Sequence, residues 1–202
     1  MYFLSTTLFC IIIVTEGRHV PGYYWRDFDG TIPDDALPGG IDSTNKPIYI
    51  GQVFATYLIP AKIYSNDKQA YYEYGGKEFS VTENIKILCT QHPEQFSWIP
   101  TDNNRIKSIT NTSLVLGGYE PGCTTYIGRT RRGGEVLVGK ALADNHPGTA
   151  GLYVTKKNVA YHSFEFDVLS YRPVVSKPSS NDDLQNSLFK IFTTPSSFVQ
   201  IE

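Results

Sequence analysis

GGIDSTNKPIYIGQVFATYLIPAK, residues Gly39 to Lys62, is the stretch that decides the fold of this chain, because it occurs twice. Residues Gly117 to Lys140 read GGYEPGCTTYIGRTRRGGEVLVGK, with the same Gly-Gly pair, acidic residue, Tyr-Ile-Gly and final lysine in the same order. The acidic residue precedes the lysine by the same number of positions in both copies. Recurrence of several features in one order predicts a duplicated unit, and a repeat takes precedence over other fold signals.

The duplication extends beyond this stretch on both sides. A tryptophan precedes each copy, Trp25 before the first and Trp98 before the second. The segment FSVTENIKIL, residues 79–88, aligns without a gap to AYHSFEFDVL, residues 160–169, and the apolar positions keep the same parity. Unchanged parity matters because a slip of one residue would turn the apolar side chains of a strand to the wrong face.

The duplication predicts how the chain is organised. We expect the two units to share one core, since a β unit of this size seldom buries enough apolar surface alone. The predicted segments are a signal peptide (1–17), an N-terminal lead (18–24), a first repeat (25–88), a linker (89–97), a second repeat (98–172) and a C-terminal tail (173–202).

The local sequence pattern predicts an all-β fold. Runs rich in Tyr, Ile, Val, Phe and Thr are separated by glycine-rich pairs, which we interpret as tight turns. The runs are PIYIGQVFATYLI (47–59), QAYYEY (69–74), TTYIGRT (124–130), GEVLVGKAL (134–142) and GLYVT (151–155). Helical periodicity occurs only in the tail, where Leu184, Leu188 and Ile191 predict a short helix. A partly disordered tail is the alternative.

The N-terminus predicts secretion. Residues 1–17, MYFLSTTLFCIIIVTEG, form an apolar run followed by small or polar residues, as in a signal peptide. The run is too short for a comfortable membrane span, which needs about 20 apolar residues. Removing it takes away one charge, Glu16, and changes the formal net charge from −2 to −1. Such a nearly neutral chain predicts no nucleic-acid or anionic membrane partner, and we interpret the basic run 129–132 as a solvated turn.

The cysteines and a glycosylation motif are consistent with a secreted protein in an oxidising compartment. Cys10 would leave with the signal peptide, so Cys89 and Cys123 remain as a candidate disulfide, with two unpaired thiols as the alternative. Asn111 begins the one Asn-x-Ser/Thr motif in the chain and is a candidate glycosylation site.

No pattern in the sequence indicates catalysis. The four histidines lack the spacing of metal ligands, and neither a Gly-x-Ser-x-Gly motif nor a phosphate-binding loop is present. We therefore predict no catalytic residue, no metal and no cofactor.

The motifs of both units resemble the DM9 repeat proteins. The first unit has Trp25, IPDDALPGGID, YIGQ, PAK, YEYGGKE and IKIL, and the second has Trp98, SLVLGGYE, YIGR, VGK and FDVL. The resemblance covers nearly all of residues 25–169 and does not include the tail. It implies an all-β body of two tandem repeats related by a pseudo-twofold axis. It also implies membership of a group in which some invertebrate proteins are mannose-binding lectins of innate immunity.

The same resemblance implies a ligand site in each unit. In such a lectin the sugar contacts are assigned to the acidic residue after Gly-Gly and to the lysine of Pro-Gly-Lys. These positions are Asp42 and Lys62 in the first unit, and Glu120 and Lys140 in the second. Two departures bear on the site: Ala61 replaces a glycine for which we expect a positive φ, and Glu120 is one methylene longer than aspartate.

These residue types suit a sugar. A carboxylate accepts hydrogen bonds from neighbouring hydroxyls while an ammonium group donates one, so the pair orients a hexose. The alternative is that each pair is an ordinary surface salt bridge.

The predicted function is therefore recognition of mannose-containing glycans by a secreted protein, with microbial surfaces as one setting and a homodimer left open. The competing hypothesis is a structural or protein-interaction module that keeps the scaffold without binding sugar.

Overall fold

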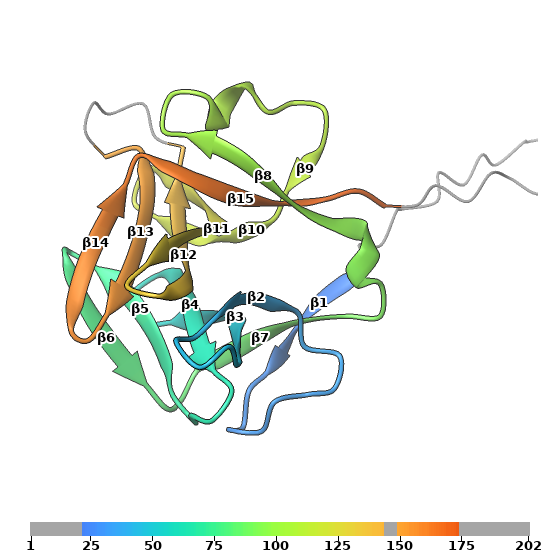
Figure 1. The fold of residues 1–202 in the computed structure, drawn as a ribbon, viewed down its shortest axis with the longest axis vertical. Helices are drawn as coiled ribbons and strands as arrows, with labels where there is room; N and C mark the ends of the chain where they lie inside the picture. The colour runs from blue at the N-terminus through green and yellow to red at the C-terminus, as the bar shows by residue number, and fades with distance from the viewer. Residues whose placement is uncertain (1–21, 144–148, 174–202) are drawn as a thin grey trace, which may run out of the picture.

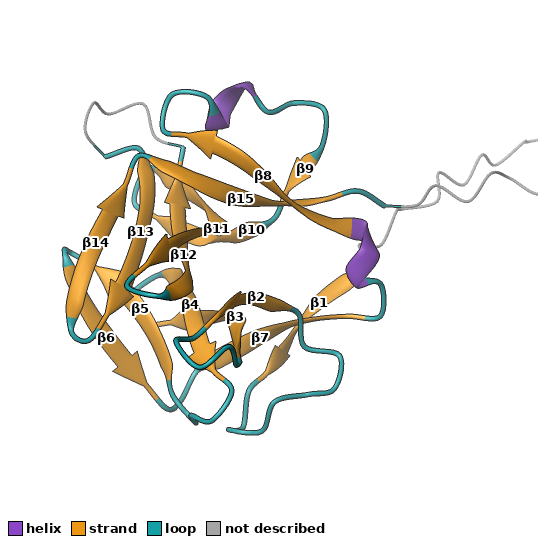
Figure 2. Cartoon of the chain, in the orientation of Figure 1, coloured by secondary structure: helices purple, strands orange, loops and turns teal. Residues whose placement is uncertain are grey.

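The computed structural model describes residues 22–143 and 149–173, and nearly all of this part of the chain is β-structure (Figures 1 and 2). The strands are β1 (Tyr23–Asp27), β2 (Pro38–Ile41), β3 (Pro47–Phe54), β4 (Leu58–Tyr64), β5 (Ala70–Tyr74), β6 (Lys77–Val81), β7 (Ile85–Thr90), β8 (Phe96–Asp102), β9 (Ser113–Leu114), β10 (Leu116–Glu120), β11 (Cys123–Arg132), β12 (Glu135–Leu142), β13 (Gly151–Lys156), β14 (Val159–Ser163) and β15 (Glu165–Tyr171). Two short 3-10 helices are η1 (Pro93–Gln95) and η2 (Ile106–Ser108).

The all-β prediction is confirmed by this architecture. The predicted signal peptide and the predicted tail helix lie outside the described residues. One predicted run is divided, because residues 47–59 form the paired strands β3 and β4 and not one continuous strand. The turn between them is closed by a hydrogen bond from Ala55 N to Tyr57 O, and neither glycine nor proline marks it in the sequence.

Equivalent strand pairings occur in the two halves of the chain. In the first half β1 pairs with β7, with Trp25 opposite Leu88. In the second half β8 pairs with β15, with Trp98 opposite Leu169. Strands β3 and β11 then pair with β7 and β15 in matching registers. These registers fit the gap-free alignment of residues 79–88 with 160–169 that the repeat predicts.

Each half also pairs a strand with the other half. β2 pairs with β12 through Ile41 and Val136, and β10 pairs with β4 through Tyr119 and Leu58. A third link joins the hairpins β5–β6 and β13–β14, which lie side by side in Figure 1 and pair through β6 and β14. The pairings β2–β3–β4–β5–β6–β14–β13–β12–β2 thereby close into a ring.

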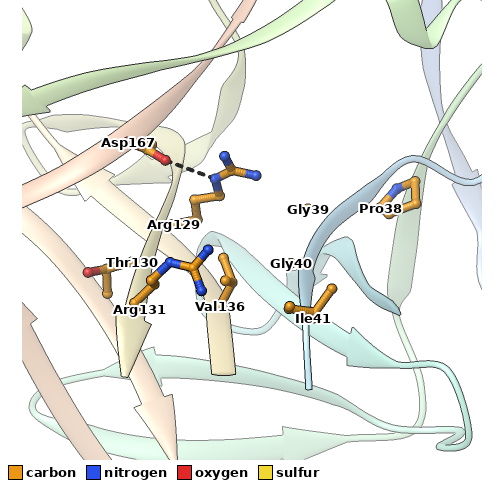
Figure 3. A pocket seen from close by; sticks show the side chains of 9 residues that line it. All are labelled: Pro38, Gly39, Gly40, Ile41, Arg129, Thr130, Arg131, Val136 and Asp167. Carbon is orange, nitrogen blue, oxygen red and sulfur yellow. Dashed lines mark hydrogen bonds and ion pairs between the residues drawn. The ribbon is translucent and has the colours of Figure 1, made fainter. Parts of the chain in front are cut away.

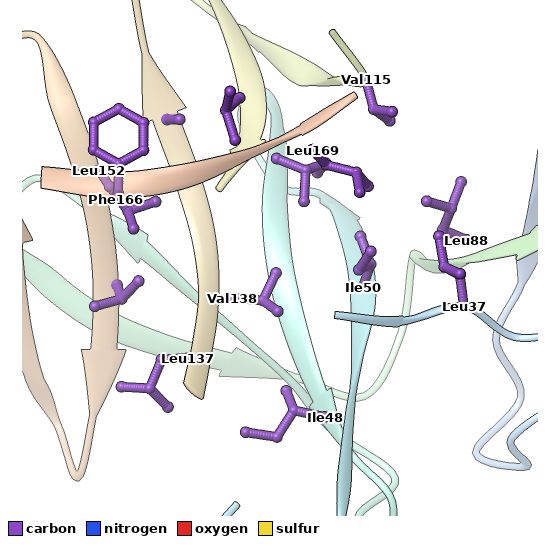
Figure 4. Packing of buried hydrophobic residues seen from close by; sticks show 14 of the residues in the cluster. Leu37, Ile48, Ile50, Leu88, Val115, Leu137, Val138, Leu152, Phe166 and Leu169 are labelled. Atoms are coloured by element: carbon purple, nitrogen blue, oxygen red, sulfur yellow. The ribbon is translucent and has the colours of Figure 1, made fainter. Parts of the chain in front are cut away.

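The main hydrophobic core draws on both halves, as Figure 4 shows. Ile50 and Leu88 from the first half pack in the same cluster as Leu152 and Leu169 from the second. Trp25 and Trp98 are partly buried against it. Full burial of one such aliphatic side chain contributes about 1.5–3 kcal/mol, so the shared cluster is a main source of stability. A smaller cluster is formed by residues of the first half alone.

The second glycine of each Gly-Gly pair lies at the contact between the halves. A Cβ atom on Gly40 would stand 1.9 Å from Val136 O, and one on Gly118 would stand 1.9 Å from Leu58 O. Our interpretation of these pairs as turn glycines is therefore wrong for Gly40, which lies in β2 without a positive φ. Lack of a side chain is needed there because the two backbones touch.

We expect Gly40→Ala to lower the free energy of unfolding by about 3 kcal/mol or more, because the opposing backbone oxygen cannot move aside. Gly75→Ala is the matched control, since Gly75 has a φ of 59° but a Cβ atom there would meet no other atom within 4 Å. That variant should lose only about 1 kcal/mol, the cost of left-handed backbone. Urea denaturation measures both values, and equal losses would contradict the proposed backbone contact.

Candidate functional site

Lys140, in the middle of β12, is brought together with its predicted partner. Its side chain is 4% exposed, and its Nζ donates a hydrogen bond to Glu120 Oε1. Nζ also lies 2.8 Å from Glu73 Oε2, which makes Glu73 a third member of the group. The rings of Tyr74 and Tyr153 lie 5.7 and 5.6 Å from the ammonium nitrogen. The predicted Glu120–Lys140 pair is thus a contact in the folded chain, with a second carboxylate beside it.

Local backbone structure explains why these carboxylates reach the lysine. Glu120 is the last residue of β10 and is paired with Cys123 across a short turn in which Gly122 has a φ of 75°. Glu73 comes from β5 in the other half, and its Oε1 accepts a hydrogen bond of 2.7 Å from Gly76 N. Both carboxylates are therefore held by hairpins, one from each half of the chain.

Lys62, in β4, is buried with different partners. Its side chain is 1% exposed, and Nζ donates hydrogen bonds of 2.8 Å to Glu78 Oε1 and 2.6 Å to Thr155 Oγ1. It also donates to the backbone oxygen of Thr155 at 2.7 Å. Tyr64 and Tyr71 place their rings 5.8 and 5.3 Å from Nζ. The ammonium group is thereby satisfied within the chain.

Asp42 is not among the partners of Lys62. It follows the end of β2, and its Oδ1 accepts hydrogen bonds from Thr44 N at 2.7 Å, Thr44 Oγ1 at 2.8 Å and Lys46 N at 2.9 Å. The backbone hydrogen bond from Lys46 is the largest cause that lowers the pKa of Asp42. The hydrogen bonds and ion pairs of the described residues include none between Asp42 and Lys62. Of the two predicted pairs, the structure brings together only the second.

The two buried lysines nevertheless occupy equivalent places. Lys62 is opposite Tyr71 in the β4–β5 pairing, and Lys140 is opposite Tyr153 in the β12–β13 pairing. Two residues beyond these tyrosines stand Glu73 and Thr155. Each lysine contacts the residue that belongs to the other half: Lys140 contacts Glu73 and Lys62 contacts Thr155.

The sequence pattern did not indicate Glu73, Glu78 and Thr155 as partners of the lysines. Glu73 and Thr155 lie far from their lysines along the chain and reach them across the contact between the halves, whereas Glu78 lies 16 residues from Lys62 in the same half and reaches it through the β4–β5–β6 pairings. The alternation of side chains along a strand could have indicated two of them. Glu73 and Thr155 are each two residues from the tyrosine opposite a lysine, so they lie on the same strand face as that tyrosine.

The two departures from the family pattern have structural explanations. Gly139, next to Lys140, has no positive φ, so that expectation is wrong. A Cβ atom there would stand 2.0 Å from Tyr153 O, and the glycine therefore provides room for the neighbouring strand. Ala61 takes the equivalent position in β4, and Lys62 beside it still reaches its partners. The longer side chain of Glu120 reaches Lys140 from the end of β10.

Three tyrosines lie beside the Glu120–Lys140–Glu73 group, two of them exposed and the third, Tyr57, half-buried. Tyr57 is 6.0 Å from Tyr74 and 6.5 Å from Tyr119, measured between ring centroids. Tyr74 is 37% exposed and Tyr119, which precedes Glu120, is 53% exposed. We call Tyr57, Tyr74 and Tyr119 the tyrosine face. It gives the carboxylate group an aromatic surface that is open to solvent.

Burial and charge act in opposite directions at Lys62 and Glu78. Burial lowers the pKa of Lys62, while its hydrogen bond to Glu78 works against that change. For Glu78, burial works to raise the pKa, but hydrogen bonds from Lys62 and Thr155 outweigh it. The pKa of Glu78 therefore lies below its ordinary value of 4.5, which favours the ionised pair.

The disulfide candidate is contradicted by the structure, because Cys89 and Cys123 are not bonded to each other. Cys89 is fully buried in the smaller core cluster, and burial raises the pKa of its thiol to about 11. Cys123 begins β11 at the β10–β11 turn, where its Sγ is 3.5 Å from Thr124 O. Asn111, the glycosylation candidate, is exposed.

The described residues contain neither a metal-binding cluster nor a membrane-spanning helix. Within residues 22–143 and 149–173, no three or more His, Cys, Asp or Glu side chains are grouped so as to hold a metal ion. The same part of the chain contains no helix with the length and apolar character needed to cross a membrane.

The two halves pair strands with each other, and each has a buried lysine on an equivalent strand. These features define an all-β protein built on a repeated unit. A sequence model of the DM9 repeat matches residues 53–158, just over half of the chain, and the chain belongs to the DM9 repeat family. Among curated proteins, no relative matches.

A solved structure with a similar fold is that of the nematode sperm cell motility protein MFP2B. The TM-score is 0.54 at 12% sequence identity, and the similarity covers 85% of this chain. This chain spans about half of that protein, 51% of its length. At this identity the likeness concerns the fold alone.

We expect the Lys62–Glu78 pair to make stability depend on pH in the acid range. Because the pKa of Glu78 is lower in the folded chain than its ordinary value of 4.5, its contribution is present above that value. It is lost as the pH falls through the folded pKa. Glu78→Gln should lower the free energy of unfolding near neutral pH by about 3–5 kcal/mol, since Lys62 stays buried without a counter-charge.

Urea denaturation at a series of pH values tests this expectation. The Glu78→Gln variant should also lose less stability on acidification than the unmodified protein does. Glu83→Gln is the control, because Glu83 is exposed and replacing it should change stability by less than about 0.5 kcal/mol. Identical acid profiles for the unmodified protein and Glu78→Gln would refute the role assigned to the pair.

Proposed function

We propose that this protein recognises mannose-containing glycans through the group of Glu120, Lys140 and Glu73, with the tyrosine face beside it. Membership of the DM9 repeat family supports a carbohydrate-recognition role. The observation that carries the proposal is the hydrogen bond between Lys140 and Glu120, the positions to which the sequence resemblance assigns sugar contacts.

The members of this group have different parts in the proposed binding. The side chain of Glu120 is 17% exposed, compared with 4% for both Lys140 and Glu73, so Glu120 is the member that a ligand reaches most easily. Lys140 holds this carboxylate in place, and a sugar hydroxyl donates to it. The apolar face of the sugar ring packs on the neighbouring tyrosines, of which Tyr119 is closest along the chain.

The expected affinity is low for a single site. A hydrogen bond to a charged group contributes about 1.5–3 kcal/mol, so a few such contacts support roughly millimolar binding. Asp42 and Lys62 do not contact each other, and we therefore propose one principal site on each chain. Stronger attachment to a microbial surface would come from several chains that bind together.

We also propose secretion and a binding role without catalysis. The apolar run at residues 1–17 and the exposed Asn-Thr-Ser motif at Asn111 support secretion. The sequence leaves a homodimer open, and the proposal does not depend on one.

The competing proposal, a protein-interaction module without sugar binding, is favoured by a separate observation. Both lysines are nearly inaccessible and have their partners within the chain, as expected for structural ion pairs. On this proposal the tyrosine face would contact another protein, and glycans would not bind.

Calorimetric titration with a mannose oligosaccharide distinguishes these proposals. Glu120→Gln keeps the size of the side chain and removes its charge, and we expect it to weaken binding roughly tenfold, the effect of about 1.4 kcal/mol. Asp42→Asn is the matched control at the equivalent position and should change affinity less than twofold, because Asp42 is bonded to its own turn. Thermal unfolding confirms that each variant is folded.

A further expected result concerns the tyrosine face. Tyr119→Ala should also weaken binding, since Tyr119 is 53% exposed and contributes to the aromatic surface. A folded, unmodified protein that binds no mannose oligosaccharide would support the protein-interaction module. Equal losses for Asp42→Asn and Glu120→Gln would refute the assignment of the site to the second unit.

A further inference from the structure

Two of the three places where the halves pair with each other, β10 with β4 and β2 with β12, are closed differently. We call the region where β10 pairs with β4, next to β3, the first seam, and the region where β2 pairs with β12, next to β11, the second seam. At the first seam Gln52, a buried residue of β3, donates a hydrogen bond of 2.7 Å from Nε2 to Gly117 O. This amide fills the space between β3 and β10.

Arg129 occupies the equivalent position at the second seam. Gln52 pairs with Lys86 of β7, and Arg129 pairs with Asp167 of β15 in the matching register. The arginine side chain turns toward that aspartate, with Nε 3.0 Å from Asp167 Oδ2 and the guanidinium carbon 4.3 Å from the Trp98 ring centroid. The arginine is therefore directed to β15 and does not fill the space next to β2, whereas Gln52 bonds to β10 across the first seam.

A pocket of about 340 Å³ is present at the second seam. Pro38, Gly39, Gly40 and Ile41 of β2 form one wall, and Arg129 and Arg131 of β11 contribute to the other, as Figure 3 shows. Its volume is roughly ten times the ~30 Å³ that a water molecule occupies in the liquid. The pocket is therefore of a size for a ring-shaped ligand and is larger than a lone inorganic anion requires.

The charges at this pocket favour an anion. Arg129 and Arg131 are two residues apart on one strand, so their side chains leave the same face. Arg129 is paired with Asp167, whereas the described ion pairs include none for the exposed Arg131. Two guanidinium groups thus face one carboxylate, and the excess positive charge is held by the residue type best suited to bind carboxylate or sulfate oxygens.

Positive charge continues from the pocket along the neighbouring turns. Arg131 and Arg132 line a second, open groove of about 700 Å³ together with Lys156, Lys157 and Tyr161. The guanidinium carbon of Arg132 is 3.7 Å from the Tyr161 ring centroid. Lys156 is paired with Glu135 at 3.0 Å. The run 129–132, which we interpreted from the sequence as a solvated turn, is thus part of a larger basic surface.

The first half has no such charges at the equivalent positions. Phe54 is opposite Leu58 in the β3–β4 pairing, as Arg131 is opposite Val136 in the β11–β12 pairing. The β5–β6 turn has Gly75 and Gly76 where the β13–β14 turn has Lys157 and Asn158. The backbone therefore does not require basic residues at these positions, and the charge is a property of the second seam.

We propose that the second-seam pocket binds an acidic sugar unit of a polysaccharide, with its carboxylate or sulfate group on Arg131 and Arg129. Adjoining acidic units lie along the groove at Arg132 and Lys157. This site is separate from the Glu120–Lys140–Glu73 group and does not depend on mannose binding there. Because the formal net charge of the chain is −2, the basic surface is local and suits a short acidic segment better than an extended polyanion such as a nucleic acid.

Calorimetric titration of the full chain with a short heparin oligosaccharide tests this site. We expect binding that Arg131→Gln weakens about tenfold, since it removes charge-assisted hydrogen bonds to the acidic group. Asp167→Asn should strengthen binding severalfold, because it releases Arg129 for the ligand. Arg172→Gln is the matched control: it removes the same charge from an exposed arginine beyond the end of β15 and should leave affinity unchanged. Thermal unfolding verifies that the variants are folded.

Titration with other ligands shows whether the pocket recognises a particular acidic group or attracts any negatively charged molecule. Retained binding of a fully desulfated oligosaccharide would assign the pocket to carboxylates, and loss of that binding would assign it to sulfates. Glu120→Gln should not change heparin affinity, which separates this proposal from the mannose site. Absence of heparin binding would overturn the proposal, as would equal losses for Arg131→Gln and Arg172→Gln. Equally tight binding of a single-stranded oligonucleotide would also overturn it.

Discussion

The backbone contact between the two halves is the constraint on which the rest of the structure depends. Strand β2 approaches β12, and β10 approaches β4, so closely that Gly40 and Gly118 leave no room for a side chain. The lysines lie on β4 and β12, the strands that receive these contacts. They are therefore enclosed between the halves, where an ammonium group needs nearby acceptors. Each lysine finds an acceptor in the other half.

Within this common backbone the two halves have acquired different chemistry. Glu120 remains in a strand and contacts its lysine, whereas Asp42 lies in a longer turn and bonds to that turn. The first seam is closed by the amide of Gln52, and the second is open because Arg129 pairs with Asp167. The duplicated scaffold thus presents a carboxylate beside aromatic rings at one place and guanidinium groups at another.

Much of the fold followed from features that repeat along the chain. Recurrence of Gly-Gly, Tyr-Ile-Gly and a lysine indicated equivalent strands, and parity placed their apolar residues correctly. The β3–β4 turn was missed because Ala55 and Tyr57 carry no turn signal. Thr155 was missed as a partner of Lys62, and the Cys89–Cys123 disulfide was wrongly expected, because both depend on distances between segments far apart in the sequence. Such distances are set by strand exchange between the halves, which local patterns do not encode.

The strand exchange also bears on how such a chain arises. One unit alone would leave β2 without the partner that β12 supplies, while two identical units could complete each other by swapping this strand. The present architecture is the one that would result from joining the subunits of a domain-swapped symmetric dimer in a single polypeptide. Covalent fusion removes the requirement that both subunits be identical, so each ancestral interface site can change independently while its counterpart keeps the original structure.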